Sequence, residues 1–119
     1  VVARTSRYRS LGVDVERTRA LDEAVASRIS VDGELDALPR SLSPLILFSA
    51  KEAFYKLQSP LTGVFLGFRD VRVEVEVEGR FELELLKDAG SLHRGQRFGG
   101  QYHHGERHVI TALALSIDD

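Results

Sequence analysis

Two carboxylates, Asp14 and Glu16, stand two positions apart in a short segment whose other alternate positions are apolar. The alternation of Leu11, Val13 and Val15 with more polar residues is typical of a β-strand. Both carboxylates are therefore predicted on one face, with Cα atoms roughly 7 Å apart. Neighbouring carboxylates repel each other, and a strand tolerates them readily only in water or around a cation such as Mg²⁺, which prefers oxygen ligands. The pair by itself fits a solvated acidic face of a sheet-edge strand at least as well as it fits a metal site.

A second charged group lies further along the chain, where Glu52 and Lys56 are one turn apart in a segment predicted to be helical. A Glu–Lys pair at this spacing is an ordinary surface ion pair worth about 0.3–0.5 kcal/mol, and the spacing alone favours that interpretation. A functional interpretation requires Glu52 to join the two strand carboxylates around a metal ion. Lys51 and Lys56 would then contact phosphate oxygens, an arrangement that the residue types permit but do not require.

This second group belongs to the longest predicted helix. Ser43 and Pro44 are a good helix start, because a capping residue is followed by proline at the first helical position. Pro60 predicts an end near Gln58. One stripe of the helix is apolar and should face the core, and it consists of Leu47, Ala50, Phe54 and Leu57, widened by Ile46 and Ala53.

The other elements are strands and two shorter helical segments. Alternating patterns predict strands over residues 11–16, 71–77, 81–85, 97–103 and 107–117, and helices over residues 18–29 and 34–38. The last strand is apolar on both faces, so we expect it to be central in the sheet. The chain is therefore predicted to be a single α+β domain, residues 1–119, with a mostly antiparallel sheet packed against one long and one shorter helix.

Composition restricts the classes of function. The net charge of −2 argues against nucleic-acid binding, and the chain has no cysteine for a disulfide framework or a thiolate zinc site. No apolar run is long enough for a membrane span, the opening residues do not resemble a secretory signal, and a cytoplasmic location is expected. Five arginines crowd the first nineteen residues, which suits either a phosphate-rich ligand or acidic partner, or a solvated surface.

The two charged groups together resemble the signature of the 4'-phosphopantetheinyl transferases. The segments that carry the resemblance are Leu11-Gly12-Val13-Asp14-Val15-Glu16 and Phe48-Ser49-Ala50-Lys51-Glu52-Ala53-Phe54-Tyr55-Lys56. The family signature joins a Gly-x-Asp segment, often with Glu two residues on, to a later Lys-Glu segment that ends in a second Lys. A single Gly-x-Asp carries no information, whereas both parts in this order are a strong indication.

Within that family, Glu16 and the short separation of the motifs resemble the larger, two-lobed transferases that serve siderophore, surfactin and polyketide synthases. The small trimeric holo-acyl-carrier-protein synthases usually lack the second carboxylate. Residues 60–68 and 109–112 also resemble the enterobactin-type branch. The resemblance covers nearly the whole chain but only the carboxy-terminal lobe of such an enzyme, and Val1-Val2-Ala3 would then end a strand that begins elsewhere, with residues 4–10 as a loop.

The resemblance implies magnesium-dependent transfer of 4'-phosphopantetheine from coenzyme A to a carrier-protein serine, with release of adenosine 3',5'-bisphosphate. Asp14, Glu16 and Glu52 would hold the metal on the coenzyme A pyrophosphate, with Mn²⁺ as the alternative ion. Glu52 or a metal-bound water would take the serine proton. Lys56 would meet phosphate oxygens or transition-state charge, and Lys51 a phosphate oxygen. The expected partners are an acyl or peptidyl carrier protein, coenzyme A, and either a first lobe or a second copy of the chain, with no nucleic acid and no membrane.

Alternatives remain open. One is a metal- or carrier-binding lobe that needs another lobe or copy for activity, and another is a structural domain in which Glu52 points to solvent far from the strand carboxylates. Three further features fit structural explanations better than chemical ones. These are the histidines 103, 104 and 108 at a hairpin tip, the glycine-rich residues 95–100, and Ser49, which has no histidine placed to activate it.

Overall fold

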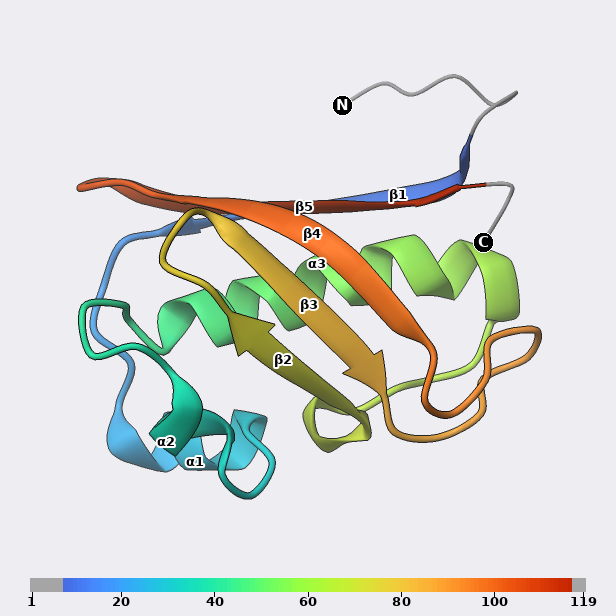
Figure 1. The fold of residues 1–119 in the computed structure, drawn as a ribbon, viewed down its shortest axis with the longest axis horizontal. Helices are drawn as coiled ribbons and strands as arrows, with labels where there is room; N and C mark the ends of the chain where they lie inside the picture. The colour runs from blue at the N-terminus through green and yellow to red at the C-terminus, as the bar shows by residue number, and fades with distance from the viewer. Residues whose placement is uncertain (1–7, 117–119) are drawn as a thin grey trace.

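Five strands and three α-helices make up residues 8–116, the part of the chain that the computed structural model describes (Figure 1). The elements are β1 (Tyr8–Arg17), α1 (Glu23–Ile29), α2 (Glu34–Ala37), α3 (Leu45–Thr62), the 3-10 turn η1 (Phe68–Asp70), β2 (Val71–Val75), β3 (Arg80–Leu85), β4 (Arg97–His104) and β5 (His108–Ser116). The predicted α+β class is confirmed. In the described residues, no helix is both long and apolar enough to cross a membrane.

The strands form one sheet in the order β1-β5-β4-β3-β2, and each neighbouring pair is antiparallel. The last strand, β5, has partners on both sides, which agrees with its apolar sequence. The first strand, β1, lies at an edge of the sheet and carries both carboxylates of the first charged group. Its register sets Asp14 opposite Thr111 and Glu16 opposite Val109.

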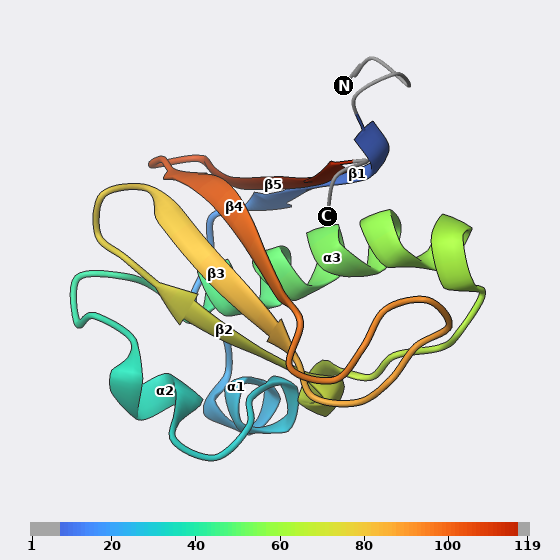
Figure 2. The same ribbon diagram turned by 45° about the vertical axis from the view of Figure 1, so that its right-hand side comes forward.

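The long helix α3 covers one face of the sheet, and the sheet curves around it (Figure 2). Its apolar stripe is buried as predicted, with Leu47, Ala50, Phe54 and Leu57 almost inaccessible to solvent. Helix and sheet approach each other closely at Gly12, because a Cβ there would overlap the carbonyl oxygen of Ala53. Glycine at this position therefore lets β1 lie directly against α3, and this contact carries Asp14 to the helix.

The shorter helices lie beside β2 and η1, near one end of α3 (Figure 1). Helix α1 begins at Glu23 rather than at Thr18, with Asp22 as its cap. Thr18 is held elsewhere, since its hydroxyl donates to the carbonyl of Gly105 and its amide to that of Arg107. The predicted start was wrong because the connection between β4 and β5 takes the capping hydroxyl.

The ends of two other elements also differ from the prediction. Helix α3 continues past Pro60 to Thr62, where Gly63 at φ 65° ends it by donating to the carbonyl of Ser59. Pro60 is tolerated because it lies in the last turn of the helix. The Gln58 side chain also stabilises this end of the helix by donating to the carbonyl of Val64. Strand β1 begins at Tyr8, inside the predicted loop 4–10, and the predicted strand end at residues 1–3 lies outside the described residues.

Candidate active site

Asp14 is the centre of the candidate site and is buried between β1 and α3. Its Oδ1 accepts a hydrogen bond from Lys56 Nζ at 2.9 Å, and its Oδ2 accepts one from Ser49 Oγ at 2.9 Å. The Lys56 side chain is 54% exposed while that of Asp14 is 6% exposed, so the ion pair spans the boundary between the interior and solvent. One ammonium and one hydroxyl therefore fix a carboxylate that would otherwise be buried without partners.

Ser49 and Thr111 form a buried hydroxyl pair behind Asp14. Their oxygens lie 2.9 Å apart, and the Thr111 hydroxyl also lies 2.9 Å from the carbonyl oxygen of Ser49. The two residues connect α3 to β5. Sequence reasoning set Ser49 aside as a nucleophile and missed that its hydroxyl donates to Asp14. Thr111 was missed as well, although a lone polar residue in an otherwise apolar strand was a usable signal.

Glu16 is half-buried one step along the strand face from Asp14 and approaches Arg19 at 3.4 Å. Its pKa is raised above the usual value. The largest cause is hydrogen bonding with the Asp14 carboxyl, which Glu16 makes only when it carries a proton, followed by burial and the charge of Asp14, while Arg19 opposes the rise. The two strand carboxylates therefore interact directly, as their spacing predicts.

Glu52 approaches the same group from α3 and is half-buried. Burial raises its pKa first and the negative charge of Asp14 second, while Lys56 lowers it. The effect of Asp14 on Glu52 means that helix and strand bring their carboxylates into electrostatic range. Excess negative charge therefore gathers around Asp14, with Lys56 as the cation that contacts it.

Lys51 lies elsewhere, although it is the residue next to Glu52. Its side chain is wholly buried, and Nζ donates to the carbonyl of Ile29 at 2.6 Å, to Glu34 Oε1 at 2.7 Å and to the carbonyl of Phe68 at 2.8 Å. These three bonds use all the donors of an ammonium group. The expected contact of Lys51 with a phosphate oxygen is therefore not what this structure displays, since helical geometry turns Lys51 into the interior.

A pocket of about 240 Å³ opens beside Glu52. One wall is α3, through Glu52, Tyr55, Gln58 and Ser59, and the other is the segment 64–68. The Tyr55 hydroxyl is buried without a hydrogen-bond partner among the described residues, and burial raises its pKa, so it stays protonated. The pocket is mostly apolar with a carboxylate at one side, which suits a chain-like ligand with a polar end.

The donor chemistry of Asp14, Glu16 and Glu52 fits a hard divalent cation, because all three offer carboxylate oxygens. The raised pKa values of Glu16 and Glu52 show that their negative charges are only partly compensated. As the side chains stand, however, no three His, Cys, Asp or Glu residues within 8–116 converge closely enough to enclose an ion. The residue types fit Mg²⁺, and the oxygens of Asp14 are at present taken by Lys56 and Ser49.

Comparison with known protein families shows which family the chain belongs to. The family model described as the 4'-phosphopantetheinyl transferase superfamily matches residues 10–113, which include every residue of the site. The chain belongs to this superfamily. The resemblance drawn from its two-part motif is thus confirmed at the level of the family.

Three curated relatives carry the same transferase name. The chain is 34% identical to 4'-phosphopantetheinyl transferase Npt of Nocardia iowensis over 97% of its length, and 34% identical to Svp of Streptomyces mobaraensis, also over 97%. It is 37% identical to PptT of Mycobacterium tuberculosis over 77% of its length. These alignments cover 59%, 51% and 45% of Npt, Svp and PptT, so the chain spans about half the length of the relatives it matches.

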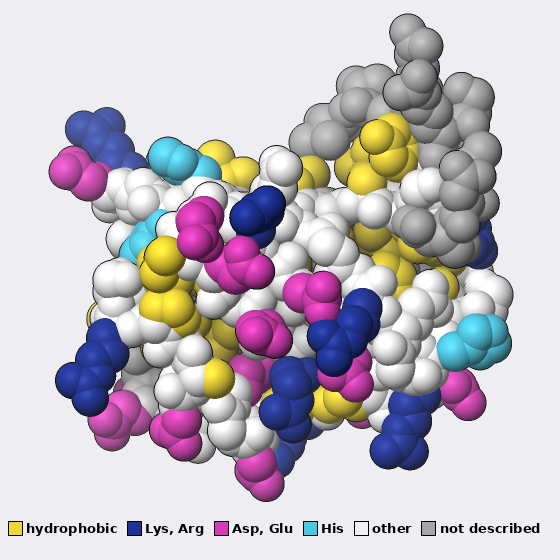
Figure 3. Space-filling view, viewed as in Figure 1, with side chains coloured by type: hydrophobic (Ala, Val, Ile, Leu, Met, Phe, Trp, Pro, Cys, Tyr) yellow, Lys and Arg dark blue, Asp and Glu magenta, His cyan; other side chains and the backbone are white. Residues whose placement is uncertain are grey.

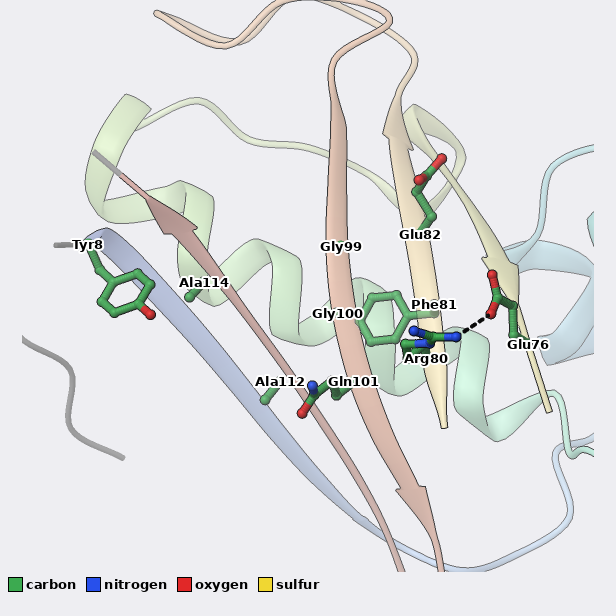
Figure 4. A pocket seen from close by; sticks show the side chains of 10 residues that line it. All are labelled: Tyr8, Glu76, Arg80, Phe81, Glu82, Gly99, Gly100, Gln101, Ala112 and Ala114. Carbon is green, nitrogen blue, oxygen red and sulfur yellow. Dashed lines mark ion pairs between the residues drawn. The ribbon is translucent and has the colours of Figure 1, made fainter. Parts of the chain in front are cut away.

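Other features of this transferase-family chain lie apart from the carboxylates. A hollow of about 760 Å³ occupies the face of the sheet away from α3, where Ala112, Ala114, Gly99 and Gln101 form a shallow floor (Figure 4). Acidic and basic side chains are intermingled on this face (Figure 3). Among them, Arg97 forms ion pairs with Glu82 and Glu84. The charges that line the hollow are thus of both signs.

The histidines of the β4–β5 hairpin do not form a metal site among the described residues. The register pairs His103 with Ile110 and His104 with Val109, so neither is the direct cross-strand partner of His108.

Proposed function

We propose that the protein transfers 4'-phosphopantetheine from coenzyme A to the serine of an acyl or peptidyl carrier protein, with release of adenosine 3',5'-bisphosphate. The observation that carries this proposal is the cluster of Asp14, Glu16 and Glu52 beside the Lys56 ammonium, at the edge of an apolar pocket. Family membership supports it, since the curated relatives are named as transferases of this group.

Asp14, Glu16 and Glu52 would hold a Mg²⁺ ion, with Mn²⁺ as the alternative. When bound, the ion neutralises charge on the coenzyme A diphosphate and on the departing bisphosphate. Lys56 is half exposed at the rim of the site, so its ammonium can exchange Asp14 for a phosphate oxygen and stabilise negative charge that develops there. Lys51 keeps its buried position and is not part of this contact.

Glu52 is the candidate general base. Burial and then the charge of Asp14 raise the pKa of Glu52 above its ordinary value, which makes its carboxylate a better proton acceptor. Its carboxylate lines the pocket, where the serine hydroxyl would approach. Glu52 would then accept the serine proton as the oxygen attacks the phosphorus that bears pantetheine.

The pocket beside Glu52 suits the pantetheine arm, which is a flexible chain with amide groups and short apolar segments. The apolar lining at Val64, Leu66 and Phe68 would cover the apolar parts, and Glu52 at the side places the phosphate end of the arm near the carboxylates. This orientation brings the scissile phosphate to the charged residues and the thiol end into the pocket.

Among residues 8–116 we assign none to contacts with the adenine and the 3'-phosphate. We therefore assign the chain to the carboxy-terminal lobe of the two-lobed type, with another lobe or a second copy supplying those contacts. The relative lengths support this assignment, since the chain aligns with about half of each relative. The alternative is a lobe that binds metal or carrier without activity of its own, and a cytoplasmic location is part of the same proposal.

A carrier-loading assay tests the proposed function, with mass spectrometry of the carrier protein as the readout. The protein should add one phosphopantetheinyl group in the presence of coenzyme A and Mg²⁺. Lys56→Met should reduce the rate by about 10²–10³, the usual loss when one donor to developing charge is removed. Lys87→Met, which alters an exposed lysine paired with Asp70, is the matched control and should load normally. Binding of coenzyme A without any loading would support the inactive-lobe alternative.

A further inference from the structure

A fully buried ion pair lies directly behind the candidate site. Lys51 Nζ and Glu34 Oε1 are 2.7 Å apart, and neither side chain is accessible to solvent. Burying two charges carries a large desolvation penalty, and apolar residues of similar volume often stabilise a protein as well or better. The pair therefore calls for an explanation other than stability alone.

The two side chains connect five elements, which are α1, α2, α3, η1 and β2. Besides Glu34 in α2, Lys51 binds the last carbonyl of α1, at Ile29, and the first carbonyl of η1, at Phe68. Glu34 also accepts from the amide of Val31 at 3.1 Å and from the amide of Val73 in β2 at 2.5 Å. An apolar pair would fill the same space but would leave these backbone groups without partners.

One of these connections leads to the pocket. Phe68 belongs to the pocket wall, and its backbone carbonyl is held by Lys51. Its ring stacks on Phe48 at 5.6 Å and meets Tyr55 edge-on at 5.6 Å, and both of these residues lie on α3 on either side of Glu52. The Lys51 ammonium thus holds the backbone at Phe68, in one wall of the pocket, against α3, which forms the opposite wall.

We propose that Lys51 is a positioning residue that sets the width of the pocket beside Glu52, by holding the carbonyl of Phe68 against α3. This inference rests on the proposed function, because the pocket is taken to receive the pantetheine arm. It replaces the phosphate contact expected for Lys51. Its consequence is selective: loss of the ammonium should affect binding of the arm and leave binding of the diphosphate to the carboxylate cluster and Lys56 unchanged.

The test compares two ligands on the same protein. Coenzyme A carries the arm, and 3'-phosphoadenosine 5'-diphosphate keeps the diphosphate but has no arm. In Lys51→Met, coenzyme A should bind about tenfold more weakly, equivalent to about 1.4 kcal/mol, while the armless nucleotide should change less than about twofold. A merely structural role predicts another pattern, because partial unfolding lowers the apparent affinity for both ligands by the same factor.

Phe68→Ala is the second variant, which keeps the buried ion pair and alters only the wall, so the test survives if Lys51→Met does not fold. It should show the same selective loss for coenzyme A. Equal losses for both ligands, or no loss for coenzyme A, in a variant with native circular dichroism would overturn the inference. If the unaltered protein binds coenzyme A, such a result leaves the proposed function intact, whereas no binding by the unaltered protein counts against the proposed function itself.

Discussion

Asp14 depends on two donors, and each has a different relation to solvent. Lys56 is half exposed and can move, whereas Ser49 is buried and is itself held by Thr111. In the proposed function, Ser49 would keep the Asp14 carboxylate in place while Lys56 contacts a phosphate oxygen. A single hydroxyl in the core thus contributes to the site without touching a substrate.

Ser49→Ala should destabilise the protein by about 1–3 kcal/mol, because Asp14 and Thr111 each lose a buried hydrogen-bond partner. Chemical denaturation measures this change. Ser59→Ala, at an exposed position of the same helix, is the control and should stay within about 0.5 kcal/mol of the unaltered protein. A loss at Ser49 no larger than at Ser59 would show that the hydroxyl does not hold Asp14.

Protonation of Glu16 should make the stability of the folded protein depend on pH. Its pKa in the folded protein is raised above the ordinary value of 4.5, so the folded state favours the protonated form. The stabilisation from this proton is present below pH 4.5 and is lost as the pH rises through the folded-state pKa. In the absence of a divalent cation, Glu16→Gln should therefore lose less stability between mildly acidic and neutral pH than the unaltered protein.

Thermal unfolding across that pH range, with and without Mg²⁺, measures the effect of Glu16. Mg²⁺ should raise the melting temperature of the unaltered protein at neutral pH, because a bound cation offsets the charge that Glu16 acquires. Mg²⁺ should raise the melting temperature of Glu16→Gln by a smaller amount. The exposed turn variant Glu78→Gln is the control and should respond to Mg²⁺ as the unaltered protein does. Equal responses of all three proteins would argue against a cation at Glu16.

Among the elements, the contact between β1 and α3 decides whether the two halves of the motif meet. Gly12 is the residue that permits it, because β1 has no room for a side chain against the carbonyl of Ala53. The glycine of the family signature thus has a physical role here. It allows a strand and a helix to approach until Asp14 reaches Ser49 and Lys56.

Gly12→Ala should destabilise the protein by about 1–3 kcal/mol, the usual penalty for overpacking a core, and should weaken metal-dependent ligand binding by displacing Asp14. Gly99→Ala is the matched control, since a Cβ at Gly99 meets nothing within 4 Å. Denaturation curves and ligand titrations of the two variants provide the comparison. If both alanines were tolerated equally well, β1 would not need a glycine at position 12 to lie against α3.

The elements also show which features are readable from sequence. Strand alternation and the apolar stripe of α3 predicted the sheet and its long helix, because side-chain periodicity follows directly from local geometry. Local patterns misplaced the start of α1, since the partners of Thr18 lie beyond β4. The burial of Lys51 could not be predicted from the sequence either, because a lysine is normally expected at the surface. Its buried hydrogen-bond acceptors come from three separate segments, and only the folded structure brings them together.

At the scale of the whole molecule, the described residues form a curved sheet whose concave face is filled by α3 and whose other face carries a shallow hollow (Figures 2 and 4). The carboxylates lie at the edge strand, where helix and sheet meet and solvent has access. At such a position the ligands of the proposed function, coenzyme A and a carrier protein, would both have access to the carboxylates. A match to about half of each relative is consistent with a site completed by a further lobe or copy.

Calorimetric titration of coenzyme A, in Mg²⁺ and in EDTA, tests the central claim that these carboxylates hold a cation beneath the diphosphate. The account predicts magnesium-dependent binding by the unaltered protein and by the control Glu82→Ala, whose glutamate pairs with Arg97 on the far face of the sheet. Glu52→Ala should bind at least about tenfold more weakly, a loss of about 1.4 kcal/mol. Binding that is the same in EDTA, binding by Glu52→Ala that matches the unaltered protein, or no binding in any condition would contradict it.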